Sequence, residues 1–247
     1  MEAADDKLNP SDLWLRGLVL EAQQEYARAN PLLDFAQERL YTPETREASQ
    51  SQMDYVCARV KERRGLIVDL ASGRAYLLDR LLASTRRHFL ATDLSPRVLR
   101  EDLARFRSLG FGSRVDALAF DALRTPFADG SLATMTTNLG LMNIDHPAGL
   151  LEELRRIVSG EILGITAFYP EDVGRNSETI HRLGLDLLYY RQSALSAFEH
   201  AGFSVVIANA RKARALPTPE SRFLAGFQPD LMPIEETELE WCTVIAR

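Results

Sequence analysis

Short apolar runs alternate with amphipathic stretches along most of this chain, from about residue 65 to its end. The apolar runs have the length and composition of buried strands. They fall at about residues 66–70, 88–92, 115–120, 132–137, 162–168, 203–210 and 239–246. The stretches between them repeat apolar residues at intervals of three and four, as helices with one buried face do. These helices are expected at about residues 76–84, 96–109, 147–159, 177–190 and 194–201. The alternation predicts the α/β class, with a parallel sheet that helices cover on both faces.

Single residues set some of these boundaries. Ser95 with Pro96 predicts the start of one helix, and Ser193 is expected to cap another. Gly160 and Gly202 are expected to end the helices before them.

The first 63 residues have a helical pattern and no strand pattern. Apolar residues recur there four positions apart, at Trp14, Leu18, Ala22 and Tyr26. We predict a helical N-terminal extension over residues 1–63, its last helix at about residues 43–63. It would serve as a lid over the active site, as an interface in a homodimer, or simply pack on the outer helices of the sheet. Residues 64–247 would form the sheet domain, with a proline-bearing insertion at about residues 213–237.

Composition and charge exclude several classes of protein. The chain is 46% hydrophobic and 26% charged, as globular proteins are. Its net charge of −6 argues against a broad nucleic-acid-binding surface, so no nucleic-acid partner is expected. No run approaches the roughly 18 apolar residues of a membrane span, and the acidic start lacks a signal-peptide pattern. We therefore expect a cytoplasmic protein.

The two cysteines carry no sign of metal or redox chemistry. Cys57 and Cys242 lie in apolar patterns and lack the spacing of either kind of site. We interpret them as reduced core thiols and predict no metal site.

Candidate chemistry begins where the first strand ends. Asp69 is followed by Ala71, Ser72 and Gly73, and small residues let a backbone turn tightly and approach a ligand closely. The next helix points its N-terminal amides at this turn. Ligands of open α/β sheets bind at this end of the strands. Taken alone, a compact turn without a ligand would explain the same pattern.

Acidic residues also follow the next two strands. Asp93 and Leu94 come about twenty residues after the turn, where a carboxylate can accept both hydroxyls of a ribose. Asp121 and Ala122 follow the third strand, where the carboxylate could accept a hydrogen bond from an adenine amine. Alone, Asp93 could cap a helix beside Ser95, and Asp121 could be a solvated turn residue. Three such signals at successive strand ends rarely coincide by accident.

Together these residues resemble the class I S-adenosylmethionine-dependent methyltransferases. The likeness is closest to the small-molecule branch that includes the quinone-biosynthesis C-methyltransferases. Residues 68–75 are similar to the acidic, glycine-rich loop of that family, residues 126–132 to its approach to strand four, and residues 150–160 to its following helix and turn. The resemblance covers roughly residues 64–212. The departures are Ala71 and Ala75 in place of loop glycines, Ala133 in place of an aspartate, and Ser159-Gly160-Glu161 in place of proline-glycine-glycine.

The resemblance implies a fold, a cofactor and a reaction. The fold would be a Rossmann-like methyltransferase sheet, mostly parallel, with its last strand antiparallel. The cofactor would be S-adenosyl-L-methionine, and the reaction the transfer of its methyl group to a small-molecule acceptor. The residues expected to hold the cofactor are Asp69, Ala71, Ser72, Gly73, Asp93, Leu94, Asp121, Ala122 and Asn138.

The acceptor is expected at the ends of the fourth and fifth strands. The candidate wall consists of Asn138, Leu139, Gly140, Met142, Phe168 and Tyr169. Tyr189 and Tyr190 could also line a pocket. Of the histidines, His146 and His181 could face it, but a helix-entry role for His146 and a surface or packing role for His181 are favoured. No catalytic base is assigned, because positioning of donor and acceptor can suffice for methyl transfer.

Two other functions fit parts of the pattern. The fold could serve as a non-catalytic binding module, or bind the cofactor for another reaction, since fold does not determine chemistry. An NAD-dependent oxidoreductase would use Asp93 equally well. Its fingerprint, however, requires glycine where Tyr76 stands, and a tyrosine would crowd the pyrophosphate.

Overall fold

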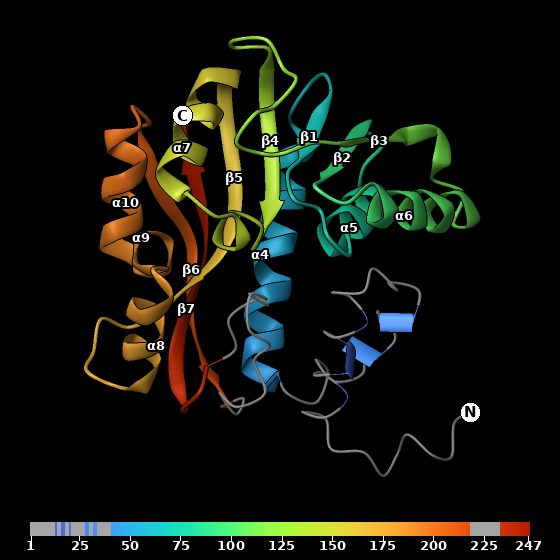
Figure 1. Ribbon diagram of the computed structural model, residues 1–247. Coiled ribbons are helices and arrows are strands. Elements are labelled where there is room, and N and C mark those ends of the chain that lie inside the picture. The colour runs from blue at the N-terminus through green and yellow to red at the C-terminus, as the bar shows by residue number, and fades with distance from the viewer. Residues whose placement is uncertain are drawn as a thin grey trace, which may run out of the picture.

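The chain folds into a seven-stranded sheet with helices on both faces (Figure 1). This computed structural model describes residues 41–217 and 233–247, and positions 13, 16, 17, 20, 28, 29, 32 and 33 of the N-terminal region. The four residues that carry the helical pattern of the extension, Trp14, Leu18, Ala22 and Tyr26, lie outside the described residues. So does most of the expected insertion.

The sheet has the strand order β3-β2-β1-β4-β5-β7-β6. The strands are β1 (Ile67–Asp69), β2 (Phe89–Asp93), β3 (Val115–Ala119), β4 (Leu132–Asn138), β5 (Val158–Phe168), β6 (Val205–Ala215) and β7 (Thr237–Ala246). Strands β1 to β5 pair in parallel, whereas β7 is antiparallel to both β5 and β6. The predicted fold class is confirmed, including the reversed last strand. Strand order changes direction between β1 and β4, which is where open α/β sheets bind ligands.

Two layers of helices bury the sheet. On one face pack α4 (Pro43–Lys61), α5 (Tyr76–Ser84) and α6 (Pro96–Ser108). On the other pack α7 (Pro147–Ile157) and α10 (Arg191–His200). The short helices α8 (Arg175–Leu183) and α9 (Asp186–Tyr189) connect β5 to α10. Ile67 of β1 faces the first layer and Val68 the second, because side chains alternate along a strand. Burial on both faces explains the almost continuous apolar run at residues 162–168 of β5.

Several expected boundaries are wrong for local reasons. The single helix expected at 177–190 is two, because Gly184 turns left-handed with φ +69° and ends α8. Ser193 does not cap α10, which begins at Arg191 without a side-chain cap. Gly160 does not stop α7; it lies inside β5, where an added Cβ would collide with the Ala133 carbonyl oxygen. By contrast, the Ser95 hydroxyl does accept from the Val98 amide and caps α6.

Helix α4, the last part of the N-terminal region, is docked on the sheet. The Gln52 amide donates to the carbonyl of Asn209 at 2.7 Å and accepts from the Thr243 hydroxyl at 3.0 Å. Arg59 and Arg63 both pair with the buried carboxylate of Glu161. These contacts make α4 a layer of the sheet domain. The lid proposal therefore concerns the residues before Tyr41, most of which lie outside the described part.

Two of the segments that carry the family resemblance contact each other. Arg156 of α7 donates to Asp129 at 2.7 Å and to the Phe127 carbonyl at 2.9 Å. Its hydrogen bond to Glu153 holds the pKa of that carboxyl down at about 2. Glu153 in turn accepts from the amide and the hydroxyl of Thr125. This network fastens the loop before β4 to α7, so these two motifs are structural.

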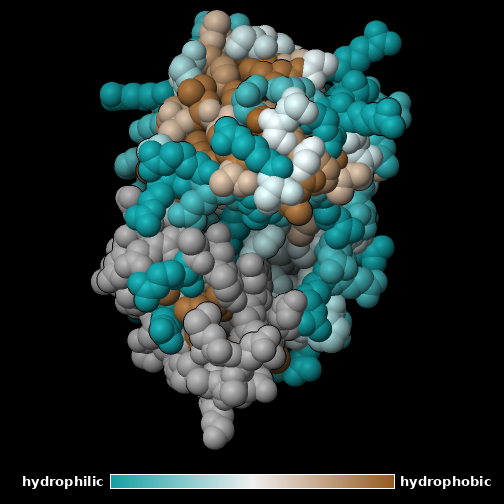
Figure 2. All heavy atoms as spheres, turned by 90° about the vertical axis from the view of Figure 1, so that its right-hand side faces the viewer, coloured by the Kyte–Doolittle hydropathy of each residue, from teal (hydrophilic) through white to brown (hydrophobic). Residues whose placement is uncertain are grey.

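The β3 side of the sheet ends at solvent. Asp116, Leu118 and Ala119 are exposed, and Asp116 lies 2.8 Å from His88 of the turn before β2. Figure 2 shows this side of the molecule, where hydrophilic side chains cover most of the described surface. Charged groups on an outer strand discourage pairing with further strands.

Some structural findings bear on the expected chemistry. Within the described ranges, no helix combines the length and the apolar character that crossing a bilayer requires, and no three metal-ligating side chains cluster. Cys57 and Cys242 are buried free thiols, and burial raises the pKa of Cys242 to about 12.

Candidate active site

The turn between β1 and α5 contains three residues with left-handed backbone. The φ angle is +50° at Ala71, +52° at Gly73 and +56° at Ala75. Glycine adopts such angles freely, whereas an L-residue there costs roughly 1–2 kcal/mol. The two alanines that replace family glycines are therefore strained, and the turn keeps its shape despite them.

Asp69 is buried beside this turn. The residue is 2% exposed, and its Oδ1 accepts a hydrogen bond from the Thr136 hydroxyl at 2.6 Å. Burial raises the pKa of this carboxyl to about 7, although hydrogen bonds from Thr136 and Ser72 favour the ionised form. The Ser72 hydroxyl also donates to the Asp69 carbonyl and accepts from the Thr92 amide. Asp69 thus changes charge near neutral pH, and a cationic ligand nearby would keep it ionised.

Asp93 fastens the same turn from the end of β2. Its Oδ2 accepts from the Gly73 amide at 3.0 Å, and Oδ1 accepts from the Ser95 amide at 2.9 Å. Burial raises the pKa of this carboxyl, against the effect of those backbone hydrogen bonds. The next residue, Leu94, is 74% exposed. A carboxylate beside an exposed apolar side chain suits a ligand that carries hydroxyl groups and a flat ring.

Two residues of α6 that sequence analysis missed stand behind the turn. Asp102 is 5% exposed, and burial raises its pKa to about 6. Arg105 donates to Asp102 at 3.1 Å, to Asp79 at 2.5 Å and to the Arg74 carbonyl at 3.3 Å. Arg105 thus ties α6 to the turn. The spacing of Asp102 and Arg105, three apart on a helix, was the available signal.

Negative charge accumulates at this edge. Burial is the main cause that raises the pKa values of Asp69 and Asp102, and neighbouring carboxylates add to it: Asp102 for Asp69, and Asp79 and Asp93 for Asp102. Such mutual repulsion is relieved when a positive ligand binds among the carboxylates. We name this region, made of residues 69–75, Asp93, Leu94 and Asp102, the acidic edge.

Asp121 and Ala122 follow β3, whose end lies beside that of β2. Asp93 is registered with Ala119 across the two strands. Asp121 is exposed, and its Oδ1 accepts from the Leu123 amide at 2.9 Å, which forms an Asx turn. Ala122 is partly buried against the core. The turn contact accounts for the position of Asp121, and its role toward adenine remains a prediction.

The end of β4 meets the turn closely. The buried Asn138 Oδ1 has no hydrogen-bond partner within the described residues, and an orphaned buried acceptor suits a ligand with N–H groups. At Gly140, an added Cβ would lie 2.9 Å from the Ala71 Cβ and 3.0 Å from the Leu70 carbonyl oxygen, and closer still to Thr137. Glycine at 140 therefore allows the loop after β4 to touch the turn after β1.

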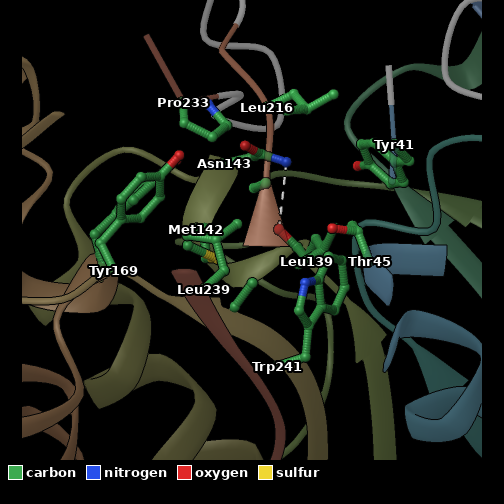
Figure 3. A pocket seen from close by; sticks show the side chains of 13 residues that line it. Tyr41, Thr45, Leu139, Met142, Asn143, Tyr169, Leu216, Pro233, Leu239 and Trp241 are labelled. Atoms are coloured by element: carbon green, nitrogen blue, oxygen red, sulfur yellow. Dashed lines mark hydrogen bonds between the residues drawn. The ribbon is translucent and has the colours of Figure 1, made fainter. Parts of the chain in front are cut away.

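Beyond this contact lies a hollow at the carboxyl ends of β4 and β5 (Figure 3). It holds about 520 Å³ of empty space, open solvent at its mouth included. The described residues that line it are Tyr41, Thr45, Leu139, Met142, Asn143, Ala167, Tyr169, Tyr189, Ala215, Leu216, Pro233, Leu239 and Trp241. All of them are uncharged. We name this hollow the neutral cavity.

The predicted acceptor wall is partly correct. Leu139, Met142 and Tyr169 line the neutral cavity, whereas Asn138 and Gly140 lie next to it in sequence without being lining residues. Phe168 is wrong: it is 2% exposed and packs in the core on the opposite face, because neighbouring residues of an extended segment point to opposite sides.

The histidines and the tyrosine pair are now placed as well. His146 precedes α7 with left-handed backbone, and His181 contacts Asp186; neither belongs to the described lining. Of the tyrosine pair, Tyr189 lines the cavity and Tyr190 does not.

Other lining residues were missed because they come from distant segments. Tyr41 and Thr45 precede and begin α4, whereas Leu239 and Trp241 lie two apart on β7. The only sequence signal for Leu239 and Trp241 was their spacing of two, which puts both side chains on the same face of β7.

No described lining residue is an ionised base. Burial, with the neighbouring Tyr189 and Tyr41, raises the pKa of Tyr169 well above its usual value, so its hydroxyl stays protonated.

The acidic edge and the neutral cavity adjoin at one end of the sheet, and known proteins share the fold of this sheet. Residues 67–160 match the family model described as a methyltransferase domain. The chain resembles the class I methyltransferases. The matched segment runs from β1 to the start of β5 and so contains the acidic edge and Asn138.

Curated relatives agree with this likeness. The demethylmenaquinone methyltransferase of Mycolicibacterium vanbaalenii is 34% identical over 147 residues, which are 59% of this chain and 56% of that protein. The chain spans about half the length of the curated relatives it matches. The predicted resemblance to quinone-biosynthesis methyltransferases is confirmed.

Solved structures share the fold. The YcgJ protein of Bacillus subtilis has a TM-score of 0.63 at 12% identity, over 80% of this chain and 97% of that one. A SAM dependent methyltransferase from Aquifex aeolicus has a TM-score of 0.53 at 15% identity, over 96% of this chain and 99% of that one. At such low identity, the likeness concerns the fold alone.

Proposed function

We propose that this chain is an S-adenosylmethionine-dependent methyltransferase that acts on a small-molecule acceptor. The observation that carries the proposal is the adjacency of the two regions: a cluster of buried carboxylates at the β1–β2 edge and an uncharged cavity after β4 and β5. A cationic cofactor matches the first, and an uncharged acceptor matches the second. The sequence match to methyltransferases over residues 67–160 supports the same conclusion.

The residues of the acidic edge fit this cofactor. The cofactor carries positive charge on its sulfonium and amino groups, which would favour the ionised form of the buried Asp69 carboxyl. Asp93 would accept from the ribose hydroxyls, and the exposed Leu94 would pack on the adenine ring. The orphaned Asn138 Oδ1 would accept from the amino group of the methionine portion.

The chemistry that the cofactor supplies is an electrophilic methyl group, which passes to a nucleophilic atom in one in-line displacement. The chain's own contribution is position. Fixing the two reactants in near-attack geometry accounts for about 7–11 kcal/mol of a barrier. The apolar walls of the cavity also exclude water from the reacting atoms. The described lining offers no ionised base, so an acceptor that is already nucleophilic is the expected substrate.

Two predictions about context belong to this proposal. We propose a cytoplasmic location, in keeping with two cysteines that are buried free thiols. The N-terminal extension is proposed as a lid over the cavity or as a homodimer interface. Tyr41 and Thr45, which lie within the extension, line the cavity and favour the lid.

A second candidate function is cofactor binding without methyl transfer. The observation that favours it is the strain at Ala71 and Ala75, which weakens the case for an optimised cofactor turn. Turnover separates the two candidates, because a binding module would bind the cofactor and transfer no methyl group.

Calorimetric titration with S-adenosylhomocysteine tests the proposal. The wild-type chain is expected to bind one molecule of this ligand. Asp93→Ala should lose about 1.5–3 kcal/mol of binding free energy, the worth of hydrogen bonds to a charged group. Asp116→Ala is the matched control, because Asp116 is an exposed aspartate on the neighbouring strand β3. Absence of binding to the wild-type chain, or equal losses in both variants, would overturn the proposal.

A further inference from the structure

The neutral cavity is lined by a buried hydrogen-bond donor for which the described residues provide no acceptor. Trp241 of β7 lines the cavity and is 2% exposed. Its indole Nε1 is buried and has no hydrogen-bond partner within the described residues. Figure 3 shows the ring rising from β7 beside Leu139, with its nitrogen on the side toward Met142 and Leu239. Since an unpaired buried donor costs about 1–3 kcal/mol, native structures rarely keep one without a purpose.

Other polar groups of the wall are already engaged. The Thr45 hydroxyl donates to the Arg214 carbonyl at 2.9 Å. The Asn143 amide donates to the Leu139 carbonyl at 3.3 Å, the dashed line in Figure 3. These bonds belong to the framework of the cavity. The indole N–H, which can only donate, therefore stands ready for an acceptor atom that the ligand brings.

The rest of the lining limits what that ligand can be. Four aromatic side chains, those of Tyr41, Tyr169, Tyr189 and Trp241, face the hollow together with aliphatic ones. No described lining residue would neutralise a carboxylate or an ammonium group, and burying an unpaired charge is strongly unfavourable. Aromatic walls favour flat rings, which stack or pack edge-on against them.

We propose that Trp241 positions the acceptor in the neutral cavity, and that its Nε1 donates a hydrogen bond to an oxygen atom of that acceptor. The inference rests on the proposed function, because it assigns a residue that positions the acceptor in the same site. Trp241 acts as a positioning residue. It fixes the acceptor so that the carbon or heteroatom to be methylated faces the cofactor side, while the oxygen faces β7.

Three bicyclic probes of similar size test the inference. They are 1-tetralone, which carries one ketone oxygen, tetralin, which lacks it, and 1-naphthoate, which adds a negative charge. Affinities are measured by calorimetry with the wild-type chain, Trp241→Phe and Met142→Leu. Met142→Leu is the matched control, because it changes another lining residue and conserves volume.

The wild-type chain is expected to prefer 1-tetralone over tetralin by about three- to tenfold, the worth of one net hydrogen bond. The preference should vanish in Trp241→Phe and persist in Met142→Leu, while 1-naphthoate binds at least about tenfold more weakly than the ketone. Equal affinity of the wild-type chain for ketone and hydrocarbon, or tighter binding of the anion, would overturn the inference.

A second measurement requires no substitution at position 241. The chain has two tryptophans, Trp14 and Trp241. In a ¹⁵N-tryptophan-labelled sample, the Trp241 indole N–H resonance, assigned with Trp14→Phe, should move downfield with 1-tetralone and stay in place with tetralin. A resonance that responds equally to both probes contradicts the inference even if Trp241→Phe does not fold. Binding of S-adenosylhomocysteine to the same sample keeps the proposed function separate, because that ligand occupies the acidic edge.

Discussion

The acidic edge and the neutral cavity lie next to each other and differ in almost every physical respect. At the acidic edge, burial raises the pKa values of three aspartates, Asp69, Asp93 and Asp102, which surround a turn with strained backbone. In the neutral cavity, the described walls are aromatic and aliphatic, and Trp241 offers a single N–H. Under the proposed function, the difference teaches that the first region recognises charge on a cofactor, whereas the second recognises the shape of an acceptor and one hydrogen-bonding atom.

The largest expected effect breaks the acidic edge alone. Gly73→Val should lower the affinity for S-adenosylhomocysteine by more than about 100-fold. A Cβ added at position 73 meets only the Ala71 carbonyl oxygen, at 4.0 Å, so the valine side chain would extend into the open space that the ligand is expected to occupy. The strained backbone also costs about 1–2 kcal/mol of stability. Calorimetry and urea unfolding measure the two effects.

Gly110→Val is the matched control for Gly73. Gly110 also has a left-handed backbone, with φ +80°, and open space around it, but it lies in the turn after α6. It should lose similar stability and keep its affinity. Normal binding by Gly73→Val would show that the turn does not face the ligand.

The second effect breaks the contact between the two regions. Gly140→Ala should lower the free energy of unfolding by about 1–3 kcal/mol, because the new methyl group would overlap Thr137 and Ala71. Gly149→Ala, on α7 with nothing within 4 Å of an added Cβ, should instead gain up to about 1 kcal/mol. Urea unfolding of both variants checks the contrast, and equal behaviour would contradict the close approach.

The third effect sharpens the electrostatic side of the comparison. Burial raises the pKa of Asp69 to about 7 from its ordinary 3.8, so the folded chain holds this proton more tightly than the unfolded chain. Stability from Asp69 is therefore full below about pH 4 and falls as pH rises to about pH 7.

Asp69→Asn isolates this contribution. The stability of the wild-type chain relative to Asp69→Asn should fall by at least about 1.4 kcal/mol between about pH 5 and about pH 8, the worth of one pKa unit. Urea unfolding at both pH values measures it. A difference that does not change with pH would mean that Asp69 stays ionised.

The smallest effect concerns strain at the turn. Ala71→Gly relieves about 1–2 kcal/mol of left-handed strain in the folded chain. It also stabilises the unfolded chain by about 0.4–1 kcal/mol through greater backbone entropy, so the free energy of unfolding should rise by about 0.5–1 kcal/mol. Ala104→Gly, at an exposed site on α6, should lose about 1 kcal/mol instead. Thermal unfolding compares them. A loss of stability in Ala71→Gly would mean that the turn is not strained at this position.

The acidic edge could be predicted from the sequence, and most of the neutral cavity could not. Asp69, Gly73 and Asp93 stand directly after apolar runs, and parallel strands bring their carboxyl ends to one edge, so periodicity alone places them together. The same logic placed Leu139, Met142 and Tyr169. The prediction was wrong for Phe168, because a shift of one position along a strand turns a side chain to the opposite face of the sheet.

The other residues of the two regions come together only through tertiary packing. Trp241 and Tyr41 lie on segments nearly 200 residues apart and meet only because β7 inserts between β5 and β6 while α4 docks beside them. Arg105 and Asp102 carry an ordinary helical ion-pair spacing, and only burial distinguishes them from a solvated pair. Pairings of this kind leave no local pattern in a sequence.

The central claim is that one end of the sheet holds two separate ligands at once, a charged cofactor and an uncharged ring. Titration of 1-tetralone into the chain saturated with S-adenosylhomocysteine tests it most directly. The account predicts a ternary complex, with one molecule of each ligand bound and the ketone affinity within about threefold of its value without the cofactor product. Displacement of one ligand by the other, with only one bound at a time, would contradict it.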